Sequence, residues 1–164
     1  MNDPAVPHTA FVGLGANLGD PAATVRDAAA AIARVPGVEA MSLSSLYRSA
    51  PVDAGGPDFV NAVAQLRTGL SPQALLAALQ AIEQQHGRQR PYRNAPRTLD
   101  LDLLLVDQIR IDTPELTLPH PRLHLRAFVL QPLAELAPGL VIPGQGPLAL
   151  WLQRCADQPI ERLA

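Results

Sequence analysis

Two helix-start signals of the same kind constrain the fold of this chain more than any other feature. Asp20 and Ser71 can each cap a helix, and each is followed by a proline at the first helical position. We expect the first helix to run to the Pro36-Gly37 pair and the second to stop at Gly87. Both helices therefore have well-marked starts and ends.

Apolar segments with strand-like patterns flank both helices, at residues 10–14, 38–47, 59–68 and 98–106. The resulting order is strand, helix, strand, strand, helix, strand, which is the split β-α-β unit of ferredoxin-like folds. It predicts an α+β protein with an antiparallel sheet and helices packed on one face. We also expect a return strand at 109–111 and extra C-terminal helices near 127–137 and 148–155.

Length and composition indicate one domain over residues 1–164, with a loose tail over residues 1–8. A net charge of −2 gives no reason to expect a nucleic-acid or membrane partner. No apolar run reaches the length of a membrane span, and the N-terminus lacks a signal-peptide pattern, so we expect a cytoplasmic protein. No stripe of residues is typical of a dimer face, so we expect a monomer.

Residue types that are missing exclude several kinds of site. Cys155 is the only cysteine, so an internal disulfide and a cysteine metal cluster are excluded. All 13 basic residues are arginines, which excludes sites built on a P-loop, Schiff-base or protein-kinase lysine. His120 and His124 are four residues apart, but the prolines beside His120 argue against a helical zinc pair. Phosphate contact or loop structure is the better interpretation of these histidines.

The strand TLDLDLLLV at 98–106 carries two aspartates in a segment that otherwise looks buried. Alternation places Asp100 and Asp102 on one face, with their Cα atoms roughly 6.5–7 Å apart. Two carboxylates at this spacing can bind one hard cation jointly, or two cations with a phosphate between them. The alternative is a solvated outer face. Continuous leucine on the other face favours a polar cleft.

The loop GRQRPYRNAPR at 87–97 precedes this strand and contains Arg88, Arg90, Arg93 and Arg97 without any acidic residue. Guanidinium groups suit phosphate oxygens. Taken singly, Arg90 and Arg93 fit a solvated basic loop equally well. Paired carboxylates beside an arginine loop favour Mg-dependent phosphoryl transfer.

Several motifs resemble those of the 6-hydroxymethyl-7,8-dihydropterin pyrophosphokinase family over nearly the whole chain. They are PRTLDLDLLL, GANLGD, YRSAPV, FVNAV and PHPRLHLRAFVLQPLAELAP. The resemblance implies an ATP:pterin diphosphokinase of folate biosynthesis. Such an enzyme transfers pyrophosphate from ATP to the hydroxymethyl group of the pterin and releases AMP.

The resemblance also implies roles for individual residues. Asp100 and Asp102 would bind two Mg²⁺ ions and, with Arg88 and Arg97, form the catalytic set. The phosphates of ATP would contact Arg88, Arg97, His120 and Arg126, and the nucleotide would also meet Gln80 and Glu83. Asn61 would hydrogen-bond the pterin, Phe128 would stack on it, and Ser49, Ala50 and Val52 would line its pocket.

The sequence departs from the family pattern in the arginine loop. In the best-known bacterial pattern a tryptophan precedes Gly-Pro-Arg in this loop, and here Asn94 and Ala95 occupy the positions of the tryptophan and the glycine. Tyr92 is a candidate for the missing ring. Glu115 stands where some members carry an arginine near the nucleotide.

Two alternatives stay open at this point. One is a different Mg-dependent phosphoryl or nucleotidyl transferase on the same fold, although Asn61 and Phe128 favour a pterin. The other is a regulatory domain that binds a small effector, which would not need paired aspartates beside an arginine loop.

Overall fold

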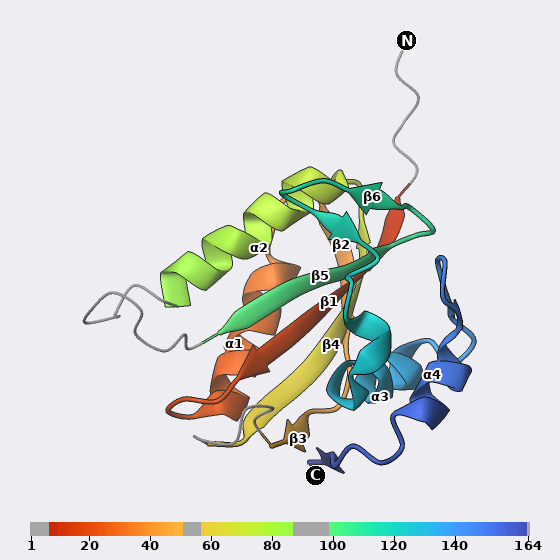
Figure 1. The fold of residues 1–164 in the computed structure, drawn as a ribbon. Coiled ribbons are helices and arrows are strands. Elements are labelled where there is room, and N and C mark those ends of the chain that lie inside the picture. Colours follow the sequence, from red (N-terminus) through yellow and green to blue (C-terminus); the bar gives the residue numbers. More distant parts are fainter. Residues whose placement is uncertain (1–6, 51–56, 87–98, 164) are drawn as a thin grey trace.

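The computed structural model describes residues 7–50, 57–86 and 99–163 (Figure 1). The first part contains β1 (His8–Ala16), α1 (Pro21–Ala33), β2 (Val38–Leu43), β3 (Tyr47–Ser49), β4 (Phe59–Thr68), α2 (Pro72–His86) and β5 (Asp100–Val106). The remainder contains β6 (Ile111–Asp112), β7 (Thr117–Leu118), the 3-10 helix η1 (Leu123–Leu125), α3 (Ala127–Leu136), β8 (Val141–Ile142), β9 (Gly146–Pro147), α4 (Leu148–Arg154) and β10 (Glu161–Arg162).

The main sheet is antiparallel, with β1 between β4 and β5. Both β2 and β3 pair with β4, each along a different half of it, and β10 pairs with β3 at the edge. The mixed helix and antiparallel-sheet architecture is therefore confirmed. The single strand predicted at 38–47 is wrong, because the chain leaves the β2 ladder at Ser44. There the Ser44 Oγ accepts a hydrogen bond from the Val63 backbone N–H at 3.0 Å.

Helices cover both faces of this sheet (Figure 1). Helices α1 and α2 pack over one core, and α3 and α4 pack over a second core on the opposite face. Neighbouring strand residues alternate between the two, so that Val12 belongs to the first core and Phe11 to the second. The expectation of helices on one face only is wrong, because the central strands are apolar on both sides.

The predicted helix starts are confirmed. The Asp20 carboxylate accepts a hydrogen bond from Ala23 N at 3.2 Å, and Ser71 Oγ accepts one from Ala74 N at 3.1 Å. Each bond satisfies one of the backbone N–H groups that a helix leaves without an internal partner. Local sequence is therefore sufficient to place both starts.

The structure differs from the sequence-based expectation at the N-terminal tail and at the strand predicted over 109–111. The predicted tail lies outside the described residues over 1–6, but His8 already begins β1, and its Nδ1 donates to the Asp107 carboxylate at 2.7 Å. The return strand at 109–111 is instead β6, which pairs with β7 and not with β5. None of the helices within the described ranges combines the length and apolar character that a membrane span requires.

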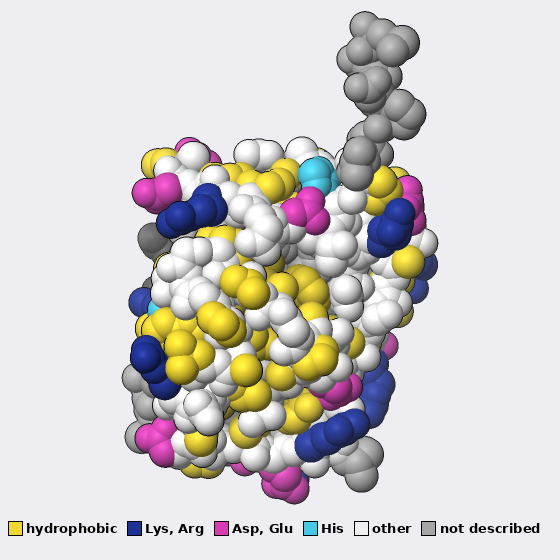
Figure 2. Space-filling view, turned by 90° about the vertical axis from the view of Figure 1, so that its right-hand side faces the viewer, with side chains coloured by type: hydrophobic (Ala, Val, Ile, Leu, Met, Phe, Trp, Pro, Cys, Tyr) yellow, Lys and Arg dark blue, Asp and Glu magenta, His cyan; other side chains and the backbone are white. Residues whose placement is uncertain are grey.

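Figure 2 shows the side of the molecule on which α4 lies in Figure 1, with apolar side chains near its centre. The large apolar residues that are most exposed in the described chain are Leu125, Val141 and Leu150. All three belong to the C-terminal segments that cover the second core. The start of α3, which directly follows η1, forms one wall of the site described next.

Candidate active site

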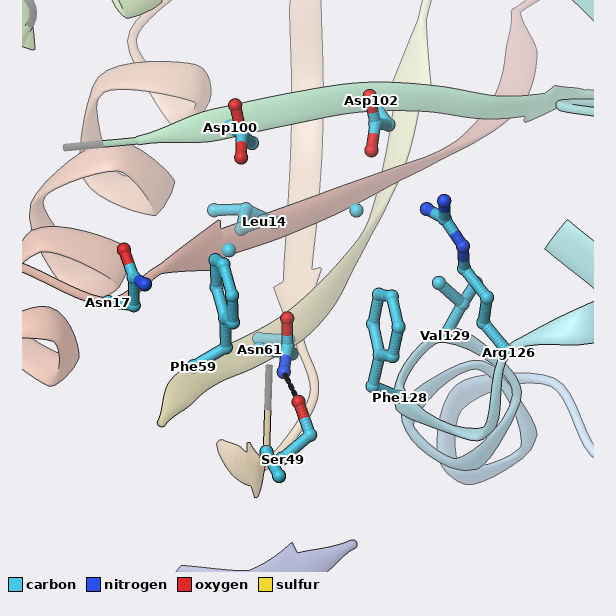
Figure 3. A pocket seen from close by; sticks show the side chains of 14 residues that line it. Leu14, Asn17, Ser49, Phe59, Asn61, Asp100, Asp102, Arg126, Phe128 and Val129 are labelled. Carbon is cyan, nitrogen blue, oxygen red and sulfur yellow. Dashed lines mark hydrogen bonds between the residues drawn. The ribbon is translucent and has the colours of Figure 1, made fainter. Parts of the chain in front are cut away.

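A pocket of about 380 Å³ lies on the face of the sheet that carries α3 (Figure 3). Strands β1, β3, β4 and β5 and the start of α3 all contribute to it. Its lining consists of Gly13, Leu14, Gly15, Asn17, Ser49, Ala50, Phe59, Asn61, Ala62, Asp100, Asp102, Arg126, Phe128 and Val129. This volume is within the usual range for a small-molecule site.

The two aspartates of β5 form one wall of the pocket. Pairing with β1 places Asp102 opposite Gly13 and Asp100 opposite Gly15, and both carboxylates are half-buried. Figure 3 shows both side chains above the pocket, separated along the same strand. The aspartates therefore line a polar cleft and do not lie on an open solvent face.

The two glycines opposite the aspartates keep the floor of the pocket open. Neither carries a side chain that would project beside the carboxylates. A Cβ atom on Gly15 would lie 3.1 Å from the side-chain oxygen Oδ1 of Asn61, which is tighter than ordinary contact. The GLGA segment of β1 therefore leaves room for a ligand between β5 and β4.

Asn61 supplies a buried amide on β4. The residue is 5% exposed, and its Nδ2 donates a hydrogen bond to Ser49 Oγ of β3 at 2.7 Å. Phe59 and Phe128 stand on either side of Asn61 in Figure 3, one from β4 and one from α3. The pocket thus combines a fixed polar group with two aromatic rings, which suits a flat ring that has a polar edge.

Positive charge enters the pocket from the start of α3. The Arg126 guanidinium lies 5.3 Å from the centre of the Phe128 ring, within the range of a cation–π interaction. In Figure 3 its side chain extends toward the side of the pocket on which Asp102 lies. The pocket therefore has two carboxylates on its β5 side, aromatic rings from β4 and α3 across from them, and a guanidinium beside the Phe128 ring.

His120 lies next to β5, where its backbone N–H donates to the Leu104 carbonyl at 2.9 Å, although it does not line the pocket. Burial lowers the pKa of His120, the negative charge of Asp102 opposes this change, and the positive charge of Arg126 adds to it. Its Nδ1 accepts a hydrogen bond from the Arg122 backbone N–H at 3.2 Å, which leaves Nε2 as the donor of a neutral ring. A neutral imidazole N–H can donate to a phosphate oxygen.

The model of the 7,8-dihydro-6-hydroxymethylpterin-pyrophosphokinase family matches residues 11–138, which contain every residue of this pocket. The chain belongs to this family. Membership assigns the reaction, which is pyrophosphate transfer to hydroxymethyldihydropterin in folate biosynthesis. Family membership therefore rules out the two alternatives raised by the sequence, which were another Mg-dependent phosphoryl or nucleotidyl transferase and a regulatory domain that binds a small effector.

Two relatives illustrate the similarity, and both are named 2-amino-4-hydroxy-6-hydroxymethyldihydropteridine pyrophosphokinase. The one from Pseudomonas aeruginosa is 47% identical over 93% of this chain and 95% of its own length. The one from Haemophilus influenzae is 40% identical over 94% of this chain and 98% of its own length. The similarity extends over nearly the full length of each.

Solved structures share the fold at much lower identity. Wild-type Plasmodium falciparum HPPK-DHPS, crystallised with pteroate, superposes on 94% of this chain with a TM-score of 0.72 and 12% identity. This chain spans 43% of that longer chain. A second structure of the wild type, with pterin and p-hydroxybenzoate, gives a TM-score of 0.71.

The structure brings most of the residues singled out in the sequence to one place. Ser49, Ala50, Asn61, Asp100, Asp102, Arg126 and Phe128 line the pocket. Arg88, Arg97 and Val52 lie outside the described residues. So do Tyr92, Asn94 and Ala95.

Two predicted nucleotide contacts lie on α2, which packs on the opposite face of the sheet. Neither Gln80 nor Glu83 lines the pocket. The Glu83 carboxylate accepts a hydrogen bond from the backbone N–H of Leu101 at 2.8 Å, between the two aspartates. Glu83 thus holds β5 against α2, while its contact with a nucleotide stays a prediction.

Seven lining residues were missed as site residues: Gly13, Leu14, Gly15, Asn17, Phe59, Ala62 and Val129. Phe59 is two positions before Asn61, so strand alternation alone could have placed both on one face. Asn17 follows the end of β1, and its Nδ2 donates to the Pro57 carbonyl at 3.4 Å. For Gly13 and Gly15, the signal was their position two residues apart in a strand, since glycine there often marks the close approach of a ligand.

Proposed function

We propose that ATP is the donor of the pyrophosphate, and that the pocket holds the pterin and the reacting phosphates together. The observation that carries this proposal is the arrangement of a single pocket. Two carboxylates lie along its β5 side, a buried amide and two phenylalanine rings lie across from them, and the Arg126 guanidinium lies beside the Phe128 ring. A charged phosphate chain and a flat heterocycle need such different surroundings, one beside the other.

The pterin would lie between Phe59 and Phe128, with its polar edge against Asn61. Stacking on both faces holds a flat ring, and the amide sets its orientation. Ser49 supports this role, because its bond to Nδ2 fixes the Asn61 side chain. Phe59 would then supply the second ring in place of the tryptophan that the arginine loop lacks, and Ala50 and Val52 would close the same side.

Asp100 and Asp102 would hold two Mg²⁺ ions. The donor set fits, because both are oxygen ligands in one half-buried wall, and Mg²⁺ in phosphate sites takes one or two carboxylates plus phosphate oxygens. Within the described residues, no group of three or more potential side-chain ligands gathers, so the phosphates would complete the coordination. When bound, Mg²⁺ neutralises charge on the triphosphate.

The chain's own part in the transfer is to position groups and compensate charge. The hydroxymethyl oxygen forms a bond to the β-phosphorus as the bond from that phosphorus to the AMP oxygen breaks, and the hydroxyl proton leaves to solvent. Arg126 and His120 would contact the phosphates, and Arg88 and Arg97 would add two further guanidinium groups. No residue needs to act as a general base.

Further features of the protein are part of the same proposal. We infer a single domain over residues 1–164 with a ferredoxin-like core, supported by the strand order β5-β1-β4-β2. We also infer a cytoplasmic monomer that binds ATP and a pterin and neither nucleic acid nor membrane. Gln80 and Glu83 are proposed to contact the nucleotide at the edge of β5.

The test is to incubate the protein with ATP, Mg²⁺ and 6-hydroxymethyl-7,8-dihydropterin and to measure AMP and pterin diphosphate. Equal amounts of both are expected. Asp102→Asn should release almost none, and Asp112→Asn, which makes the same change at an exposed position on β6, should behave as wild type. Release of ADP, or the absence of pterin-dependent AMP from the wild type, would contradict the proposal.

A further inference from the structure

The segment that follows α4 returns to the start of α3 and contacts the residues on both sides of Arg126. Gln158 lies in this segment, and its side-chain Oε1 accepts a hydrogen bond from the Ala127 backbone N–H at 2.9 Å. Its Nε2 donates to the Leu125 backbone carbonyl, also at 2.9 Å. One amide therefore holds the backbone immediately before and immediately after the residue that brings positive charge into the pocket.

The start of α3 needs such a partner because of the residue that precedes it. Arg126 occupies the N-cap position, and its side chain makes no capping hydrogen bond. A guanidinium has no acceptor, so it cannot satisfy the first N–H groups of a helix. The acceptor for Ala127 N–H must come from elsewhere in the chain, and the Gln158 oxygen provides it.

Arg126 is also the point at which the chain changes direction. It is an extended residue, with φ −125° and ψ 116°, between the 3-10 helix η1 and α3. Rotation of the backbone at this residue would move the guanidinium relative to the Phe128 ring. Because Gln158 bonds to the residues on both sides, it restricts that rotation.

The same segment also supports the opposite wall of the pocket. In β10, Glu161 pairs with Arg48 of β3, and Arg162 pairs with Tyr47. Strand β3 carries Ser49, which fixes the Asn61 amide. The C-terminal segment thus connects the strand behind Asn61 with the start of α3.

We propose that Gln158 is a positioning residue, which sets Arg126 and Phe128 at the distance from Asn61 and Asp102 that the two substrates require. This inference rests on the proposed function of the pocket and assigns a role beyond residues 11–138, where the family match ends. Gln158 is exposed and its bond to the Leu125 carbonyl lies at the surface, so water can replace that bond when it is lost, and only the bond to Ala127 N–H is partly buried. The main effect of losing them is therefore on the geometry of the site and not on folding.

Three variants test the proposal. Gln158→Met keeps the length of the side chain and removes both hydrogen bonds. Gln158→Glu keeps an acceptor for Ala127 N–H but loses the donor to the Leu125 carbonyl. Gln153→Met makes the same apolar change at an exposed position of α4 and serves as the control.

The measurements are kcat and KM for each substrate, well below the melting temperature, with circular dichroism to verify folding. Since a displacement of about 1 Å can cost about 10²-fold in rate, we expect Gln158→Met to lose on the order of 10- to 100-fold in kcat/KM. Gln158→Glu should lose less, and Gln153→Met should match the wild type. The melting temperature of Gln158→Met should change by only a few degrees.

Two results would overturn the proposal. One is unchanged kinetics in Gln158→Met, which together with a lower melting temperature would make Gln158 a structural contact only. The other is an equal loss in Gln153→Met. Failure of the proposed function is a separate result, because it appears as missing pterin-dependent AMP release in the wild type.

Discussion

Removal of the Tyr47 hydroxyl should lower the free energy of unfolding by about 1.5–3 kcal/mol, the range for a hydrogen bond to a charged group. Tyr47 of β3 is 7% exposed and donates to a carboxylate oxygen of Glu135 at 2.8 Å. Glu135 belongs to α3 and also accepts hydrogen bonds from the backbone N–H and the hydroxyl of Ser45. Tyr47→Phe therefore removes one of several bonds that connect the sheet with the helix.

The titration of this tyrosine gives an independent magnitude. Burial, and then the hydrogen bond to Glu135, raise the pKa of Tyr47 from its ordinary value of 10.0 to about 12. At about 1.4 kcal/mol for each pH unit, the fold disfavours the ionised phenol by roughly 2–3 kcal/mol, with burial as the larger cause and the hydrogen bond as the second. A raised pKa means that the fold favours the neutral phenol. Its contribution is complete below pH 10 and is lost as the pH rises through 12.

The pKa of Glu135 is shifted in the opposite direction, below its ordinary value. Partial burial alone would raise its pKa, but the hydrogen bonds from Ser45 and Tyr47 outweigh burial and hold the pKa below its ordinary value. Its contribution to stability is therefore present above the ordinary carboxyl pKa and is lost as the pH falls through the lowered value. The contact between β3 and α3 should be strongest between these two limits.

Urea unfolding of the wild type and Tyr47→Phe at neutral pH measures the change in the free energy of unfolding. The tyrosinate absorbance measures the pKa of Tyr47, because Tyr47 and Tyr92 are the only tyrosines and Tyr47→Phe retains Tyr92 alone. The difference between the two titration curves is the titration of Tyr47. A midpoint near pH 10 in that difference, or equal unfolding free energies, would refute the reasoning.

Three further predictions concern the pocket. Asp102→Asn should nearly abolish turnover, while melting curves without Mg²⁺ show equal or higher stability, because one of two neighbouring negative charges is removed; wild-type turnover would disprove the metal assignment. Asn61→Ala should weaken pterin binding by about 1–3 kcal/mol in calorimetric titration and leave binding of a non-hydrolysable ATP analogue unchanged. Gly15→Ala should also weaken pterin binding selectively, because its Cβ would lie 3.1 Å from Asn61 Oδ1; equal losses for both ligands would mean a structural role.

The sequence by itself determined the features that depend on near neighbours in the chain. The helix caps at Asp20 and Ser71, the bounds of β4 and the shared face of Asp100 and Asp102 all follow from residues within a few positions. Backbone N–H groups at a helix start and the alternation of a strand impose local rules, and those rules hold here. The family motifs likewise pointed to the pterin pocket before its shape was visible.

Tertiary structure decided which distant segments meet. The break between β2 and β3 depends on Ser44 contacting Val63, and the second core depends on α3 and α4 folding back over the sheet. Glu83 bonds to the backbone of β5, which its sequence neighbours do not indicate.

Gln158 is the clearest case, because its partners are 31 and 33 residues away. Its amide is needed because Arg126, at the N-cap of α3, cannot accept a hydrogen bond from the Ala127 N–H. Such pairings depend on packing and register across the whole fold, and no local preference of the chain encodes them.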